Sequence, residues 1–134
     1  MGKPLFKKSS ISDSLKEKTE KLDLLLQKLA EKGNEGAVIL VEGMNDVKAL
    51  RSIGITGKIQ CIKNRRTPLY DILSEYVNMG EELIVLTDFD RRGTQLAGKI
   101  VNFIEKHGKT VNLTFWMKMR GFLSNDIKDV EGLP

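Results

Sequence analysis

Two carboxylates separated by one residue, Asp88 and Asp90, follow an uncharged run from Leu83 to Thr87. A third acid, Glu42, comes directly after another apolar run, residues 36–41. Crowded carboxylates repel one another and raise each other's pKa unless a cation lies between them. Three roles are open for these acids: they could bind one or two Mg²⁺ ions, act as general acid or base, or cap the helices that follow.

Basic side chains stand close to these acids in the sequence. Arg91 and Arg92 follow the acid pair, and Lys63, Arg65 and Arg66 follow another short apolar run. Arginine binds phosphate through two parallel hydrogen bonds, and a metal held by acids attracts phosphate groups. Acids, a metal and arginines together favour phosphodiester chemistry. The alternative is that these arginines are surface charges that only neutralise the acids.

Strand and helix patterns alternate along the chain. Short apolar runs predict strands at 36–41, 58–62, 82–87 and 110–116, and periodic segments predict helices at 12–32, 45–53, 67–78 and 92–107. This alternation indicates an α/β fold with a parallel, doubly wound sheet, in which ligands bind at the carboxyl ends of the strands. Glu42, the basic loop 63–66 and the Asp88/Asp90 pair all map to that edge. Asp46 either caps the second helix or lies just outside the site as a further acid.

Composition narrows the class of protein. The 134 residues, 40% apolar and 30% charged, fit one globular domain with a packed core. The longest apolar run is far short of the ~20 residues that cross a bilayer, and the polar amino terminus is no signal peptide. We therefore expect a cytoplasmic protein without membrane contact. The net charge of +4 favours polyanionic partners, and a single cysteine excludes an internal disulfide.

Three segments are expected along the chain. Residues 1–35 form a basic arm and an amphipathic helix, 36–116 the α/β domain, and 117–134 a less regular tail that packs on or near it. The leucines of the first helix either dock on the domain's own core or form a homodimer. The tail carries three acids to which the sequence assigns no role: Asp126, Asp129 and Glu131.

Two motifs together resemble a known family, the Toprim domain. The first is V-E-G-x-x-D, residues 41–46, and the second is L-T-D-F-D-x-x-G, residues 86–93. This domain is shared by topoisomerases, bacterial-type primases, nucleases of the old family, recombination-repair proteins and the maturase of 5S ribosomal RNA. The chain looks most like the small stand-alone Toprim proteins of archaea and bacteria.

The resemblance implies a Rossmann-like fold with a four-stranded parallel sheet, here with an extra N-terminal helix. It implies that Glu42 is both a metal ligand and the general acid or base. By the same resemblance Asp88 and Asp90 bind one or two Mg²⁺ ions, for which Mn²⁺ substitutes, and Asp88 could serve both metals of a two-metal site.

The sequence also departs from parts of the family. Arg92 stands where topoisomerase versions carry a third acid, and no partner domain with a catalytic tyrosine is visible, so topoisomerase activity is not expected. No P-loop or dinucleotide motif is present either. We expect a Mg²⁺-dependent phosphodiester enzyme acting on RNA or DNA. The alternative is a non-catalytic module that binds metal and nucleic acid and acts with a partner protein. Phosphoryl transfer through an aspartyl phosphate fits less well, because its D-x-D is expected on the first strand.

Overall fold

Three parallel strands form the central layer of the molecule. The computed structural model describes residues 13–63 and 66–130, in which β1 (Val38–Val41), β2 (Lys58–Cys61) and β3 (Leu83–Leu86) pair in the order β2-β1-β3. Val38 at the start of β1 lies opposite Lys58 on one side and Leu83 on the other, both in parallel register. The predicted α/β fold with a parallel sheet is confirmed.

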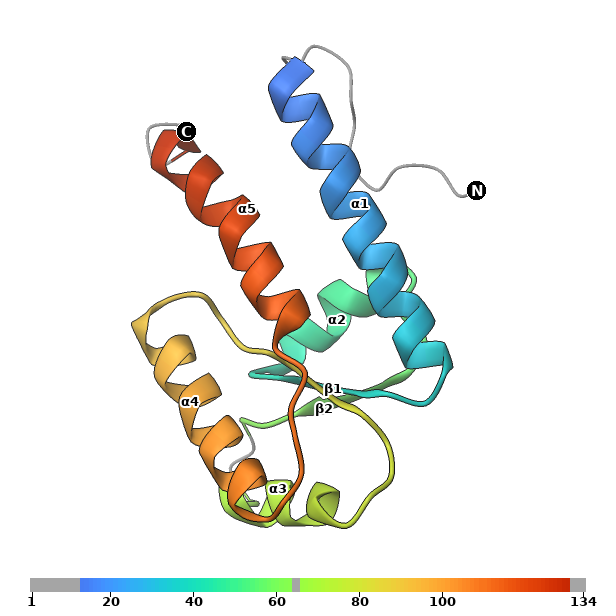
Figure 1. Cartoon of the computed structure of the whole chain (residues 1–134), viewed down its shortest axis with the longest axis vertical. Helices are drawn as coiled ribbons and strands as arrows, with labels where there is room; N and C mark the ends of the chain where they lie inside the picture. Colours follow the sequence, from blue (N-terminus) through green and yellow to red (C-terminus); the bar gives the residue numbers. More distant parts are fainter. Residues whose placement is uncertain (1–12, 64–65, 131–134) are drawn as a thin grey trace.

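Helices cover both faces of this sheet. They are α1 (Asp13–Asn34), α2 (Met44–Ser52), α3 (Leu69–Val77), α4 (Arg91–Lys106) and α5 (Thr114–Val130). In Figure 1, α3 and α4 lie below the sheet, and α1, α2 and α5 lie above it. The first four helices each begin within two residues of the predicted start. Apolar continuity and helical periodicity therefore located these elements correctly.

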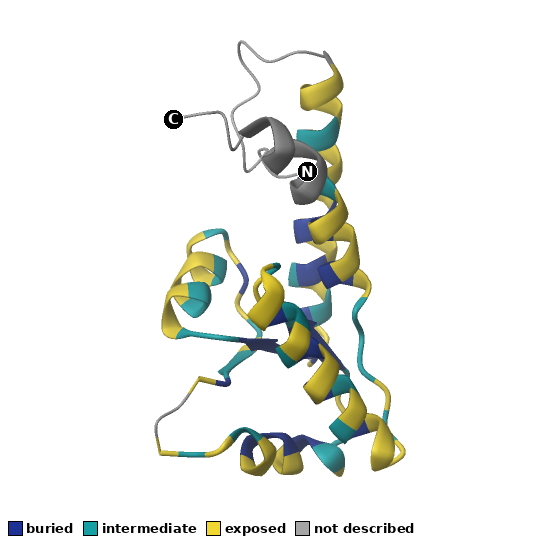
Figure 2. Cartoon of the chain, turned by 90° about the vertical axis from the view of Figure 1, so that its left-hand side faces the viewer, coloured by how far each residue is buried: buried dark blue, intermediate teal, exposed yellow. Residues whose placement is uncertain are grey.

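Alternate residues of β1 serve two separate cores. Val38 and Leu40 pack with the buried residues of α3 and α4, whereas Ile39 and Val41 pack with those of α1 and α5. All four side chains are buried. Figure 2 shows dark blue, the colour of buried residues, in the middle of the molecule, where the sheet lies. A strand covered on both faces needs apolar residues at every position, which explains its unbroken apolar run.

The predicted fourth strand, residues 110–116, is wrong. Within the described chain this segment makes a single bridge to β3, at Asn112, and α5 then begins at Thr114. The Asn112 side-chain oxygen accepts the backbone N–H of Thr114 at 2.8 Å, which turns the chain into a helix. Asparagine is uncommon in strands and favoured at helix starts. Asn112 therefore starts a helix, although the alternating apolar residues around it predicted a strand.

The C-terminal segment is more regular than predicted. Residues 117–130, expected to be irregular, continue α5, which carries the backbone of Asp126 and Asp129. Glu131 and the basic arm, residues 1–10, lie outside the described residues. Of the helices in the described ranges, none is both long and apolar enough to cross a bilayer.

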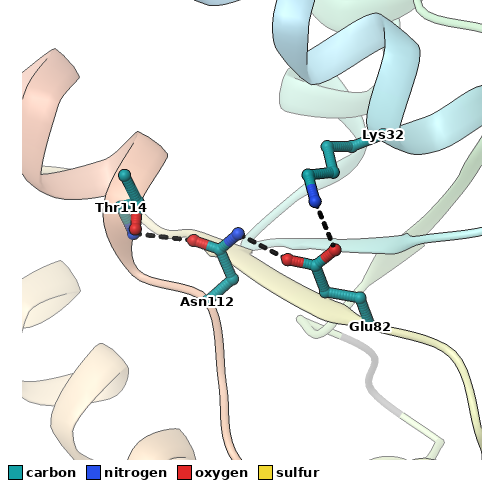
Figure 3. A network of polar contacts seen from close by, with 4 residues as sticks. All are labelled: Lys32, Glu82, Asn112 and Thr114. Carbon is teal, nitrogen blue, oxygen red and sulfur yellow. Dashed lines mark hydrogen bonds and ion pairs between the residues drawn. The ribbon is translucent and has the colours of Figure 1, made fainter.

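A polar network ties the amino ends of the strands to two helices (Figure 3). The Lys32 ammonium of α1 lies 3.1 Å from one carboxylate oxygen of Glu82, and the Asn112 amide donates to the other at 2.6 Å. Burial acts to raise the pKa of Glu82, but the Asn112 hydrogen bond and the Lys32 charge outweigh it and hold this pKa below its usual value. The charge of Glu82 is thus neutralised within the protein.

Candidate metal centre

The predicted acids of β1 and β3 meet where the strand order reverses. The chain passes from β1 to β2 on one side of the sheet and then returns to β3 on the other, so β1 and β3 border the switch point at which such sheets bind ligands. Glu42 follows β1, Asp88 lies just beyond the end of β3, and the Asp88 backbone N–H donates to Glu42 Oε1 at 2.9 Å. One hydrogen bond therefore joins the two motifs.

The turn that carries Asp88 is fixed from two sides. The buried Thr87 hydroxyl donates to the carbonyl of Gly93 at 2.8 Å, which connects β3 to α4. The Trp116 indole N–H of α5 donates to the carbonyl of Thr87 at 2.9 Å, and its ring lies 5.7 Å from that of Phe89. Because both hydrogen bonds are buried, the acid pair projects from a rigid turn and not from a flexible loop.

Gly93 permits the close approach of α4 to this turn. A Cβ built at position 93 would overlap the backbone carbonyl oxygen of Asp88. Any other residue would push the first turn of α4 away from the acid pair. The glycine at the end of the second motif is therefore required by packing.

Asp90 and Asp46 both cap helices. The Asp90 carboxylate accepts the backbone N–H of Gly93 at 2.7 Å at the start of α4. The Asp46 carboxylate accepts the N–H of Gly43 at 3.0 Å at the start of α2. Such contacts satisfy donors that a helix terminus leaves unpaired.

Asp88 is different, because no described residue makes a hydrogen bond or an ion pair with its carboxylate. Burial, together with the charges of Glu42, Asp46 and Asp90, raises the pKa of the Asp88 carboxyl, and Lys63 only partly offsets this. Asp88 is therefore the carboxylate on which the charges of three other acids act, with Lys63 as the partial offset. A bound cation would relieve this repulsion.

The chemistry of these side chains fits Mg²⁺, which prefers carboxylate oxygens and retains several waters. Their placement fits less completely. No three acids among the described residues lie close enough together to hold a single ion. Asp88 carries the carboxylate open to a cation, while Glu42 and Asp90 accept backbone N–H groups.

The two residues joined by the Glu42–Asp88 hydrogen bond line different clefts. An acidic cleft of about 670 Å³ contains Asp46, Asp88 and Asp90. A basic cleft of about 300 Å³ contains Glu42 with three cations, and its lining residues are Glu42, Ile62, Lys63, Leu69, Arg92, Gln95, Leu96 and Lys99. An acidic site beside a basic one is the arrangement that a metal and a phosphate would require.

The structure separates the predicted basic residues. Lys63 and Arg92 line the basic cleft. Arg66 and Arg91 are exposed but line neither cleft, and Arg65 lies outside the described residues. Two further polar residues of this cleft, Gln95 and Lys99, were not predicted from the sequence. Their spacing of three and seven residues from Arg92 on one helix was the signal that could have revealed them.

Comparisons with known proteins agree with this architecture. The family model described as "Toprim domain" matches residues 37–116. A UPF0292 protein of Methanosarcina barkeri is 34% identical over 118 residues, covering 88% of this chain and 81% of the relative. A UPF0292 protein of Thermococcus kodakarensis is 38% identical over 109 residues, covering 81% and 77%. A solved structure, a putative protein from Aquifex aeolicus, superposes with a TM-score of 0.61 at 30% identity, covering 78% of this chain and 89% of the other.

Proposed function

Because this chain belongs to the Toprim domain family and to the UPF0292 family of small archaeal proteins, we propose that it is a Mg²⁺-dependent enzyme that acts on phosphodiester bonds of RNA or DNA. One observation carries the proposal. The 2.9 Å hydrogen bond from the Asp88 backbone to Glu42 brings the acid of one motif against the acid pair of the other, between an acidic and a basic cleft.

The proposed role of each residue follows from the cleft in which it lies. Asp88 would hold the metal, and Asp90 and Glu42 would join it once their carboxylates turn from the backbone N–H groups that they accept in this structure, with Asp46 supporting them from the start of α2. Held there, Mg²⁺ or Mn²⁺ would supply Lewis-acid polarisation of a phosphoryl oxygen. Glu42, which lines the basic cleft and accepts the N–H of Asp88, takes or returns the proton of the attacking or leaving oxygen. Lys63 and Arg92 bind the phosphate from the basic cleft.

Cleavage assays with matched variants test this proposal. RNA and DNA oligonucleotides, single- and double-stranded, are incubated with the full chain in Mg²⁺, in Mn²⁺ and in EDTA. We expect divalent-dependent cleavage that falls about 10²-fold or more in Glu42→Gln and Asp88→Asn. Glu82→Gln, the same change at the opposite edge of the sheet, is the control and should retain activity. Cleavage that continues in EDTA, or that survives Asp88→Asn, contradicts the proposal.

A second candidate is a module that binds metal and nucleic acid without cleaving alone. It is favoured by the capping contact of Asp90 and by the absence of three converging acids in the described ranges. In such a module a partner protein would complete the site. Salt-sensitive binding of nucleic acid without cleavage in any divalent metal, at protein concentrations that saturate binding, would favour this candidate over the enzyme.

A further inference from the structure

A second hollow extends the basic cleft along α4. It has a volume of about 450 Å³ and is lined by Tyr70, Lys99, Asn102, Phe103 and Lys106. Lys99 lines both hollows, so they are neighbours along α4, and Glu42 lines the first of them. Figure 1 shows α3 beside α4 along this side of the molecule. We call this surface, Arg92 to Lys106 of α4 with Tyr70 of α3, the α4 stripe.

The polar side chains of the α4 stripe share one face of the helix. Arg92, Gln95, Lys99, Asn102 and Lys106 follow one another at intervals of three or four residues. This face carries three cations and no acid. At 1.5 Å per residue it is roughly 21 Å long. Three positive charges spaced seven residues apart over this length match an extended polyanion better than a single phosphate.

Aromatic side chains lie within this basic row. Tyr70 is 48% exposed, although large aromatic residues are usually mostly buried. Its ring lies 5.1 Å from that of Phe103, which in turn lies 4.6 Å from His107. The phenol ring is thus supported from beneath by α4 and remains accessible from solvent. Cations interleaved with an accessible aromatic ring are what proteins use to bind single strands, whose bases stack on the ring.

We propose that the α4 stripe binds a single-stranded nucleic acid. A base stacks on Tyr70, phosphates contact Lys99 and Lys106, and the strand leads through the basic cleft towards Glu42. A duplex fits less well, because its bases already stack on one another and offer no free face to Tyr70. This inference rests on the proposed function and specifies its substrate class.

Binding measured without metal tests the charge contribution. The probe is a fluorescein-labelled oligothymidylate or oligouridylate of about twelve nucleotides, titrated with the full chain in EDTA and followed by fluorescence anisotropy. We expect Lys99→Gln/Lys106→Gln to weaken binding about tenfold or more. The slope of log affinity against log salt should decrease by about 1.4, because two phosphate contacts are lost. Lys21→Gln/Lys28→Gln, the same charge change on exposed positions of α1, should alter affinity less than about twofold.

The stacking contribution is tested by two changes at one position. Tyr70→Ala should lower affinity for the single strand about fivefold or more, whereas Tyr70→Phe should retain it because the ring is kept. A duplex of the same length should bind more weakly and respond less to Tyr70→Ala. Equal loss in Lys21→Gln/Lys28→Gln and in Lys99→Gln/Lys106→Gln, or tighter binding of the duplex, overturns the inference.

The outcome separates this inference from the proposed function. If binding depends on the α4 stripe but no metal-dependent cleavage is found, the single-strand inference is supported and the proposed enzymatic function is excluded. If metal-dependent cleavage is found but is unaffected by Tyr70→Ala and Lys99→Gln/Lys106→Gln, the enzymatic function is supported and the role of the α4 stripe in binding is excluded.

Discussion

Acidic side chains stand at both edges of the same small sheet, and their surroundings are opposite. At the amino edge, Glu82 receives an ion pair from Lys32 at 3.1 Å and a hydrogen bond from Asn112 at 2.6 Å, and its pKa is lowered. At the carboxyl edge, burial and neighbouring carboxylates, Glu42 first among them, raise the pKa of Asp88.

This difference in surroundings indicates that Glu82, and not Asp88, has a structural role. A charge that the protein neutralises itself contributes to folding, whereas a charge left among like charges costs stability and requires another reason to be present. The hydrogen bonds differ as well. At the amino edge the side chains of Lys32 and Asn112 bind the Glu82 carboxylate itself. At the carboxyl edge the side chains of Thr87 and Trp116 donate to buried backbone carbonyls and so hold the turn, not the Asp88 carboxylate. Four experiments, ordered by expected effect, test the comparison.

The largest effect is expected from Gly93→Ala. The new methyl group would overlap the Asp88 carbonyl, so α4 must move or the acid turn must distort, at a cost of about 3 kcal/mol of unfolding free energy. Gly98→Ala is the matched control on the same helix, where a Cβ meets no atom within 4 Å. It should stabilise the protein by about 0.5 kcal/mol. Urea unfolding of both variants measures this, and equal stability of the two would contradict the packing role of Gly93.

Added metal should stabilise the folded protein, and this stabilisation should depend on the acids of the carboxyl edge alone. At a Mg²⁺ or Mn²⁺ concentration about a hundred times the dissociation constant, linkage predicts roughly 2.7 kcal/mol of extra stability. Thermal unfolding with and without metal should show this shift in the wild type and in Glu82→Gln, and should not show it in Asp88→Asn. A response that persists in Asp88→Asn would place any metal elsewhere.

Trp116→Phe, a change at the same edge of the sheet, should lower the free energy of unfolding by a smaller amount. The change keeps an aromatic ring beside Phe89 but leaves the buried carbonyl of Thr87 without its donor, which costs about 1–2 kcal/mol. Met117→Leu, at the neighbouring 63% exposed position, is the control and should be nearly neutral. If chemical denaturation finds the two variants equally stable, the indole hydrogen bond does not hold the turn.

The smallest effects should have opposite signs at the two edges. In EDTA at neutral pH, Glu82→Gln should destabilise the protein by about 0.5 kcal/mol after solvent screening, whereas Asp88→Asn should be neutral or slightly stabilising.

The effect of Glu82 should also depend on pH. Since the folded pKa of Glu82 is lowered, its contribution to the free energy of unfolding is complete above the unfolded pKa of about 4.3 and disappears as the pH falls through the folded pKa. Unfolding curves between neutral and acidic pH measure both trends, and a Glu82→Gln deficit that grows on acidification would reverse the assignment.

The sequence predicted that Glu42 and the Asp88/Asp90 pair lie at the same edge of the sheet, because parallel strands end at a common edge. That Glu42 and Asp88 are direct neighbours follows from the pairing of β1 with β3, which the sequence pattern does not specify. The helix starts were predictable for a similarly local reason, since caps and turns are encoded by neighbouring residues.

Other features depend on contacts between distant segments. Asn112 could continue a strand or start a helix, and only its hydrogen bonds to Glu82 and Thr114 decide between them. The capping contact of Asp90 depends on its rotamer. The place of Lys99 in a cleft depends on how α4 is rotated against the sheet, which the contact of Gly93 with Asp88 sets. Patterns along the chain do not carry this information.

The indole of Trp116 has a consequence for the order of events during synthesis. Ribosomes release the amino-terminal part of a chain first. Both motifs of the site therefore emerge before the residue that fastens the Asp88 turn from α5. A nascent chain thus carries its acids early, but the Asp88 turn gains the indole hydrogen bond only after α5 has been made and has docked.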